Sequence, residues 1–137
     1  MHMNVFINTI VFVKDIARSK LFYNQVLGLK IIADYQTIVF FENHFTIHIG
    51  NVLLRTIFKR SPMFDFKKGK RNIEIYFETE DIEKAFKTIV NSKARVIHPI
   101  ENQAWGQKVF RFYDPDNHII EIGEPFHEVN IAKENSV

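Results

Sequence analysis

The chain has 137 residues, a length that fits one compact domain able to fold without covalent staples. Hydrophobic residues make up 46% and charged residues 25%, as in ordinary globular proteins, and a net charge of +2 gives no reason to expect nucleic acid as a partner. The absence of cysteine excludes disulfides and thiolate chemistry. No apolar run is long enough to span a bilayer and the start lacks signal-peptide features, so we expect a cytoplasmic enzyme or binding protein with no membrane partner.

The first half of the chain predicts a strand, a helix and three further strands. Residues 5–13 are rich in β-branched and aromatic side chains, and Asp15 is placed to cap a helix that ends at Gly28. Short apolar segments then predict strands at 29–33, 38–42 and 45–50. We therefore expect a β-α-β-β-β module over residues 5–50.

The second half predicts the same order of elements over residues 72–123. A strand at 73–79 leads to Asp81, which is placed to cap an amphipathic helix whose apolar residues are Ile82, Ala85, Phe86, Ile89 and Val90. Strands follow at 95–98, 108–113 and 118–123. The last two are joined by a turn at Asp114-Pro115-Asp116-Asn117, and residues 101–106 are expected to form a longer loop.

The two predicted modules also repeat each other in sequence. Thr46-Ile47-His48-Ile49-Gly50-Asn51 is echoed by Ile119-Ile120-Glu121-Ile122-Gly123-Glu124. Four polar residues fall at equivalent places in the apolar strands, and side-chain alternation turns them toward one face: Asn8, His48, Glu74 and Glu121. We therefore predict an α+β fold in which two pseudo-symmetric β-α-β-β-β modules form a cupped mixed sheet around a cavity, with Asn8 and Glu74 as symmetric counterparts.

The join between the modules, residues 51–71, combines basic residues with aromatic ones. It holds seven basic residues and a single acid, Asp65, with Phe58, Phe64 and Phe66 between them. The simplest interpretation is a solvated connector whose rings pack on the domain. The alternative is a lid that draws an anionic ligand to the cavity. The tail, residues 124–137, is expected to be loosely held.

Two groups of motifs together resemble one known superfamily. The opening group is Val13-Lys14-Asp15-Ile16, Phe22-Tyr23 and Leu27-Gly28-Leu29. The closing group is Trp105-Gly106-Gln107, Phe112-Tyr113-Asp114-Pro115-Asp116-Asn117-His118 and Ile120-Glu121-Ile122. In this order they resemble the vicinal-oxygen-chelate superfamily of glyoxalase, bleomycin-resistance and extradiol-dioxygenase proteins. The resemblance covers both modules and implies a homodimer, with residues 58–66 as a candidate contact.

The resemblance also implies a site. Metal-dependent members place their ligands at the four repeat-related positions, which implies a divalent ion (zinc, nickel, iron or manganese) held by His48, Glu74 and Glu121. Many members carry histidine where this chain has Asn8 and Glu74. Either glutamate is a candidate catalytic base. The predicted ligand contacts are Asn8, Tyr76, Trp105, Phe110 and Phe112.

Two functions remain open at this point. The first is a metal-assisted lyase or isomerase of the glyoxalase type, in which the ion polarises a carbonyl and a glutamate moves a proton. The second is a metal-free binding protein of the resistance type that sequesters an amphipathic or aromatic compound. Two adjacent carboxylates repel each other, so either one is protonated or a cation lies between them.

Overall fold

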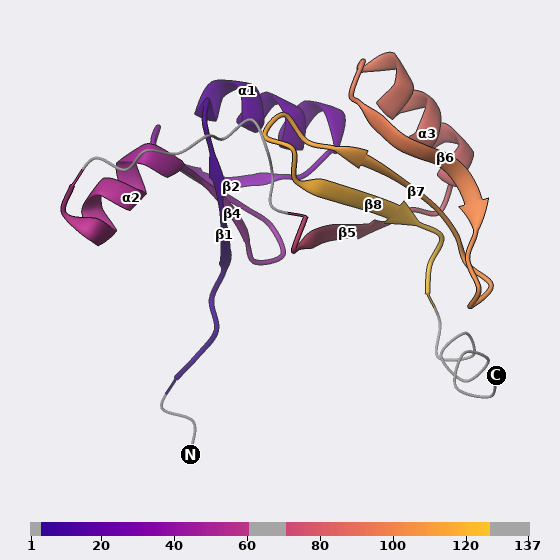
Figure 1. Cartoon of the computed structure of the whole chain (residues 1–137), viewed down its shortest axis with the longest axis horizontal. Coiled ribbons are helices and arrows are strands. Elements are labelled where there is room, and N and C mark those ends of the chain that lie inside the picture. Colours follow the sequence, from indigo (N-terminus) through magenta and orange to yellow (C-terminus); the bar gives the residue numbers. More distant parts are fainter. Residues whose placement is uncertain (1–3, 61–70, 127–137) are drawn as a thin grey trace. The chain divides into compact units, whose positions relative to one another are not determined.

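The computed structural model describes residues 4–60 and 71–126 (Figure 1). The chain divides into two compact units, Met1–Phe66 and Lys67–Val137, and each is described by itself. The expectations for Phe64 and Phe66 in the connector, and for the tail beyond Phe126, lie outside the described residues. Every helix in the described ranges is too short or too polar to cross a membrane.

Unit one is a four-stranded mixed sheet with helical segments. Its elements in chain order are β1 (Thr9–Val13), α1 (Ile16–Leu21), the π-helix η1 (Phe22–Val26), β2 (Ile31–Asp34), β3 (Ile38–Phe41), β4 (Phe45–Ile49) and α2 (Gly50–Phe58). The strand order is β1-β4-β3-β2, with β1 and β4 parallel and the other neighbours antiparallel.

Unit two repeats this plan. Its elements are β5 (Glu74–Glu78), α3 (Ile82–Asn91), β6 (Val96–Asn102), β7 (Lys108–Tyr113) and β8 (Ile119–Gly123). The strand order is β5-β8-β7-β6, again with the first pair parallel and the others antiparallel. Two similar modules of an α+β fold are therefore confirmed.

Helix capping sets the start of both main helices. The side chain of Asp15 accepts a hydrogen bond from the Arg18 amide at 3.1 Å, and that of Asp81 accepts one from the Lys84 amide at 3.1 Å. Each carboxylate satisfies a backbone donor that the first helical turn leaves unpaired. Gly28 follows the first helix with φ of +79°, a conformation that glycine adopts without steric cost.

One face of each sheet carries the hydrophobic core and its helix. In unit one, the Tyr23 ring packs on Phe41 and Phe45, with ring centroids 6.1 and 4.9 Å away. In unit two, Phe86 of α3 meets Phe110 edge-on at 5.1 Å. Because side chains alternate along a strand, every second residue is left for the opposite face of the sheet.

Three elements differ from the sequence-based expectation. Strand β1 begins at Thr9 and not at residue 5, so Asn8 lies before the strand. Residues 50–58 of the expected connector form α2, which begins without a side-chain cap and so carries no start signal. Strand β6 continues to Asn102, which shortens the expected loop at 101–106 to the segment after that residue. Pro99 is tolerated inside β6 because this strand lies at the edge of its sheet.

The strand register corrects one predicted equivalence. His48 pairs with Phe12, and its counterpart Glu121 pairs with Tyr76. Glu74, two residues before Tyr76, therefore corresponds to Ile10, and Asn8 is not its symmetric counterpart. The prediction took its alignment from the helix caps, but three residues separate Asp81 from Phe77, the counterpart of Val13, whereas one residue separates Asp15 from Val13.

Candidate functional site

The polar face of unit two lies on the side of the sheet away from α3. Glu121 in β8 has Tyr76 of β5 as its neighbour on one side and Arg111 of β7 on the other. Glu74 lies two residues before Tyr76, so it shares the same face. We call Glu74, Arg111 and Glu121 the charged triad.

Arg111 joins the two carboxylates of the charged triad. Its Nε donates to Glu121 Oε1 at 2.7 Å, and its Nη2 lies 2.6 Å from the same oxygen. The same Nε lies 3.4 Å from Glu74 Oε2. The Glu121 side chain is only 7% exposed, so a buried carboxylate is compensated by a guanidinium of the protein itself.

Two further side chains orient the guanidinium. Arg111 Nη2 donates to Gln103 Oε1 at 3.3 Å, and Nη1 lies 2.9 Å from His98 Nε2. Arginine nitrogens act only as hydrogen-bond donors, so His98 Nε2 is the acceptor in this contact. The imidazole proton is then on Nδ1, which lies 2.8 Å from the Pro99 carbonyl. His98 is therefore neutral in this arrangement, and the guanidinium is held from three sides.

Glu74 is the accessible member of the triad. Its side chain is 40% exposed. Partial burial raises the pKa of the Glu74 carboxyl, the nearby Glu121 carboxylate raises it further, and Arg111 offsets part of that increase. A half-exposed carboxyl with a raised pKa has the properties of a group that gives or takes a proton, or that binds a cationic ligand.

Next to the triad, Gln107 connects two side chains and one backbone carbonyl. Gln107 is 3% exposed. Its Nε2 donates to Tyr76 Oη at 2.7 Å and to the Glu124 carbonyl at 2.5 Å, while its Oε1 accepts from Trp105 Nε1 at 2.8 Å. Gln107 thus holds Trp105 and Tyr76 in position, as a pre-organised binding site requires.

Tyr76 also binds a carboxylate. Its hydroxyl donates to Glu78 Oε2 at 2.7 Å. Partial burial together with this hydrogen bond raises the pKa of Tyr76 to about 12, so the phenol stays neutral at physiological pH. Because Tyr76 remains 43% exposed, its ring is available for contact with a ligand.

Two residues predicted as ligand contacts have a different place. Phe110 and Phe112 are fully buried, with their rings stacked 5.7 Å apart on the α3 side of the sheet. Neither side chain is exposed, so neither can contact a ligand, and both belong to the core.

The residue between them, Arg111, points to the polar face, and the sequence analysis did not predict it. The hairpin turn at 114–117 carried the signal, because the register it sets pairs Arg111 with Glu121.

Asn8 and His48 belong to unit one. With its amide oriented to donate, Asn8 lies 3.2 Å from the His44 carbonyl, which makes it a backbone-binding residue. His48 Nδ1 donates to the Ile49 carbonyl at 3.0 Å, which leaves Nε2 as an acceptor. The convergence of these two residues with Glu74 and Glu121 stays a prediction.

Within unit two, a cation of the protein itself already pairs with the two carboxylates of the expected ligand set. In unit two, both carboxylates of the expected ligand set are bound to Arg111. In residues 4–60 and 71–126, no three His, Asp or Glu side chains lie close enough together to hold an ion. Of the two alternatives for the adjacent carboxylates, a protonated acid or a cation between them, unit two has a cation, the guanidinium of Arg111.

Duplicated modules with this strand order define the vicinal-oxygen-chelate fold. The chain belongs to the glyoxalase-like domain family, whose model matches residues 6–127. The structure of a protein of unknown function from Agrobacterium tumefaciens str. C58 is 48% identical, covers 92% of this chain and 98% of that one, and has a TM-score of 0.84.

More distant structures share the fold alone. A lactoylglutathione lyase from Agrobacterium tumefaciens is 18% identical, with a TM-score of 0.67 and coverage of 88% of this chain and 92% of that one. A glyoxalase/bleomycin resistance protein/dioxygenase from Nocardioides is 14% identical, with a TM-score of 0.70 and coverage of 90% of this chain and 85% of that one.

A relative found by sequence matches only part of the chain. An uncharacterised protein of Mycobacterium bovis is 30% identical over 63 residues, which are 46% of this chain. The chain spans about 41% of the length of that curated relative.

Proposed function

We propose that this protein binds a small organic molecule on the polar face of unit two without a resident transition metal, as a sequestration protein of the resistance type. The observation that carries the proposal is the position of Arg111, which satisfies the two carboxylates that a metal site would use. A guanidinium that is also held by Gln103 and His98 is not readily displaced by an ion.

The chemistry of the face favours a cationic aromatic or amphipathic ligand. The Arg111 guanidinium contacts the carboxylates of Glu74 and Glu121, and Glu78, whose carboxylate is bound by Tyr76, adds a third carboxylate to the same face, where His98 is neutral. The surplus of negative charge attracts a cation, and Glu74 is exposed enough to meet it. The rings of Tyr76 and Trp105 supply surface for an aromatic or cationic group.

Two ions of nearly equal size and opposite charge test this proposal. Trp105 is the single tryptophan of the chain, so its fluorescence reports on the site. We expect tetraphenylphosphonium to change that fluorescence saturably and tetraphenylborate to leave it unchanged. Glu74→Gln should weaken binding of the cation about fivefold, as expected for one half-exposed ion pair, whereas the matched control Glu80→Gln should not. Equal responses to the two ions would contradict the proposal.

The metal-dependent alternative is tested on the same protein. Cobalt(II) is titrated into metal-stripped wild type and into His48→Ala while the visible absorption of the ion is recorded. We expect no saturable change at micromolar protein. Saturable binding in wild type that is lost in His48→Ala would refute the metal-free proposal and restore the enzyme interpretation.

The raised pKa of Glu74 favours a second candidate, a proton-transfer enzyme with Glu74 as its base. The lactoylglutathione lyase with the same fold supplies a first substrate to try. Turnover of lactoylglutathione, followed by ultraviolet absorbance, should then fall at least about 100-fold in Glu74→Gln. Turnover that is equal in the two proteins would exclude Glu74 as the base.

A further inference from the structure

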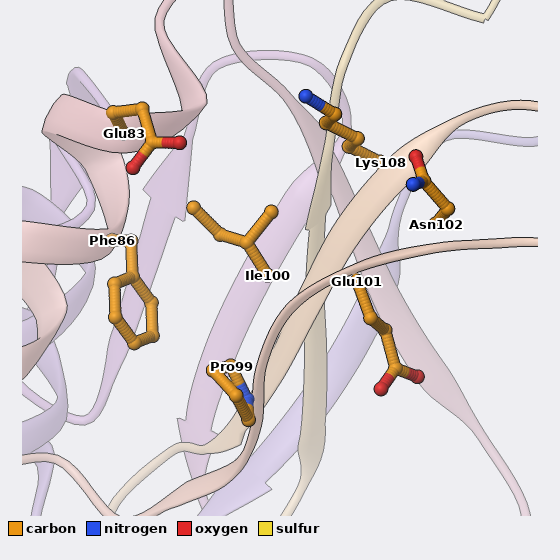
Figure 2. A pocket seen from close by; sticks show the side chains of 7 residues that line it. All are labelled: Glu83, Phe86, Pro99, Ile100, Glu101, Asn102 and Lys108. Carbon is orange, nitrogen blue, oxygen red and sulfur yellow. The ribbon is translucent and has the colours of Figure 1, made fainter.

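A pocket of about 330 Å³ lies in unit two between α3 and strands β6 and β7 (Figure 2). Lys108 of β7 lines it, opposite its β6 partner Asn102. Phe110, two residues along β7, faces α3 and contacts Phe86, whereas Arg111 faces the other side of the sheet. The pocket is therefore on the α3 side and is separate from the charged triad.

The floor of the pocket is apolar. It is formed by the Phe86 ring from α3 and by Pro99 and Ile100 from β6. Figure 2 shows the Ile100 side chain between the other two and the rim. Phe86 is held by its edge-on contact with the buried Phe110, and Pro99 has few conformations to lose. Such a floor accepts a small branched aliphatic group without reorganisation.

The rim of the pocket carries two opposite charges. The Glu83 carboxylate and the Lys108 ammonium lie along one side of it, with Ile100 between them in Figure 2. Neither side chain has an ion-pair partner among residues 4–60 and 71–126. The third charged side chain, Glu101, turns its carboxylate away, toward His98 Nδ1 at 3.6 Å and Gln103 Nε2 at 3.4 Å. One anionic and one cationic group are therefore left to face a ligand.

We propose that this pocket is a second small-molecule site, and that its ligand is a zwitterion with a short apolar side chain, of the kind represented by free L-leucine. The ligand ammonium would pair with Glu83 and its carboxylate with Lys108, while the side chain covers Phe86, Pro99 and Ile100. The volume is at the lower end of the range for ligand pockets, which suits a molecule of about this size. An anion or a cation alone would leave one of the two rim charges without a partner.

Three probes that differ by one group test the proposal. L-leucine carries both charges, 4-methylpentanoate lacks the ammonium, and 3-methylbutan-1-amine lacks the carboxylate. Each is titrated into the full-length protein while amide chemical shifts are followed by NMR. We expect saturable shifts at Glu83, Ile100 and Lys108 with leucine, a Kd below about 1 mM, and binding about fivefold weaker for either analogue. Absence of leucine binding, or equal binding of the three probes, would overturn the proposal.

Variants with matched controls separate the rim charges from general electrostatics. Glu83→Gln and Lys108→Gln should each weaken leucine binding about fivefold. Glu80→Gln and Lys87→Gln change the same charges at exposed positions outside the pocket, and they should bind leucine as wild type does. Equal losses in the controls would show that no specific site exists. Because all four are surface side chains, thermal unfolding should show that each variant folds. The outcome is independent of whether the charged triad binds a ligand.

Discussion

At one equivalent position in the two sheets, the cross-strand neighbours are apolar in unit one and polar in unit two. In unit one, His48 has Phe12 and Ile38 as its cross-strand neighbours. In unit two, the corresponding Glu121 has Tyr76 and Arg111. The strand order and the capped helices are the same in both units. Among the described residues, unit one also has α2 after its last strand, so the comparison concerns the side chains around this point of the two sheets.

This contrast separates the residues that make the fold from those that make a site. Each unit buries apolar residues on its helix side, for example Ile47 and Ile120, which are both fully buried. Burial of this kind supplies the free energy of folding. A buried Glu121 adds a desolvation cost that Arg111 only offsets. The charged triad stands where unit one has Ile10, Ile38 and His48, and this contrast supports the functional role proposed for the triad.

The largest expected effect comes from removing the guanidinium. Arg111→Met leaves Glu121 buried without a partner, and we expect it to lower the free energy of unfolding by about 3 kcal/mol at neutral pH. The equivalent change in unit one, Ile38→Met, exchanges apolar groups of similar volume and should cost less than about 1.5 kcal/mol. Urea denaturation of both variants measures the difference.

A double variant sharpens this prediction. Arg111→Met with Glu121→Met removes both charges, so it should recover most of the stability that Arg111→Met loses. If the double variant is no more stable than the single one, packing of the arginine stem, and not pairing of charge, explains the loss. Equal costs at Arg111 and Ile38 would remove the contrast between the units.

A smaller effect on stability is expected at the aspartate N-caps, a feature that the two units share. Asp15→Ala and Asp81→Ala each remove a carboxylate that accepts a hydrogen bond from the backbone amide three residues later in the chain. We expect a loss of about 1 kcal/mol in each case, because both replace an N-cap with the same geometry. Urea denaturation again provides the values. Costs that differ by more than twofold would show that the caps contribute unequally to the two units.

The smallest effect is a pH dependence at Glu74. An acid with a raised pKa binds its proton more tightly in the folded state, so its contribution to stability falls as pH rises through the interval from the ordinary glutamate pKa to the raised one. Glu74→Gln resembles the protonated form, and it should be more stable than wild type at pH 7 and equal to it near about pH 3.5. The difference should stay below about 1 kcal/mol because Glu74 is 40% exposed. Thermal unfolding across this pH range checks the sign.

Local signals in the sequence predicted the repeat, the caps and most strands. Asp15 and Asp81 act within one helical turn, and strand β7 has the predicted bounds because the turn after it fixes the hairpin. The site was harder to predict because it depends on the pairing of strands distant in sequence. The face of Glu74, Tyr76 and Glu121 followed from alternation, but Arg111 required the β7–β8 register. Helix α2 was missed because it begins without a capping side chain.

The two-residue difference in spacing between strand and helix cap shows what kind of change the repeat tolerates. Successive side chains on a strand point to opposite faces, so a shift of the register by one residue would exchange core and surface along its whole length. The mismatch between Asn8 and Glu74 amounts to two residues on the strand, one full period, and it leaves every side chain on its original face. Duplicated halves of this kind can therefore drift apart in sequence in even steps, and alignment of such repeats should follow strand pairing and not the distance to the helix.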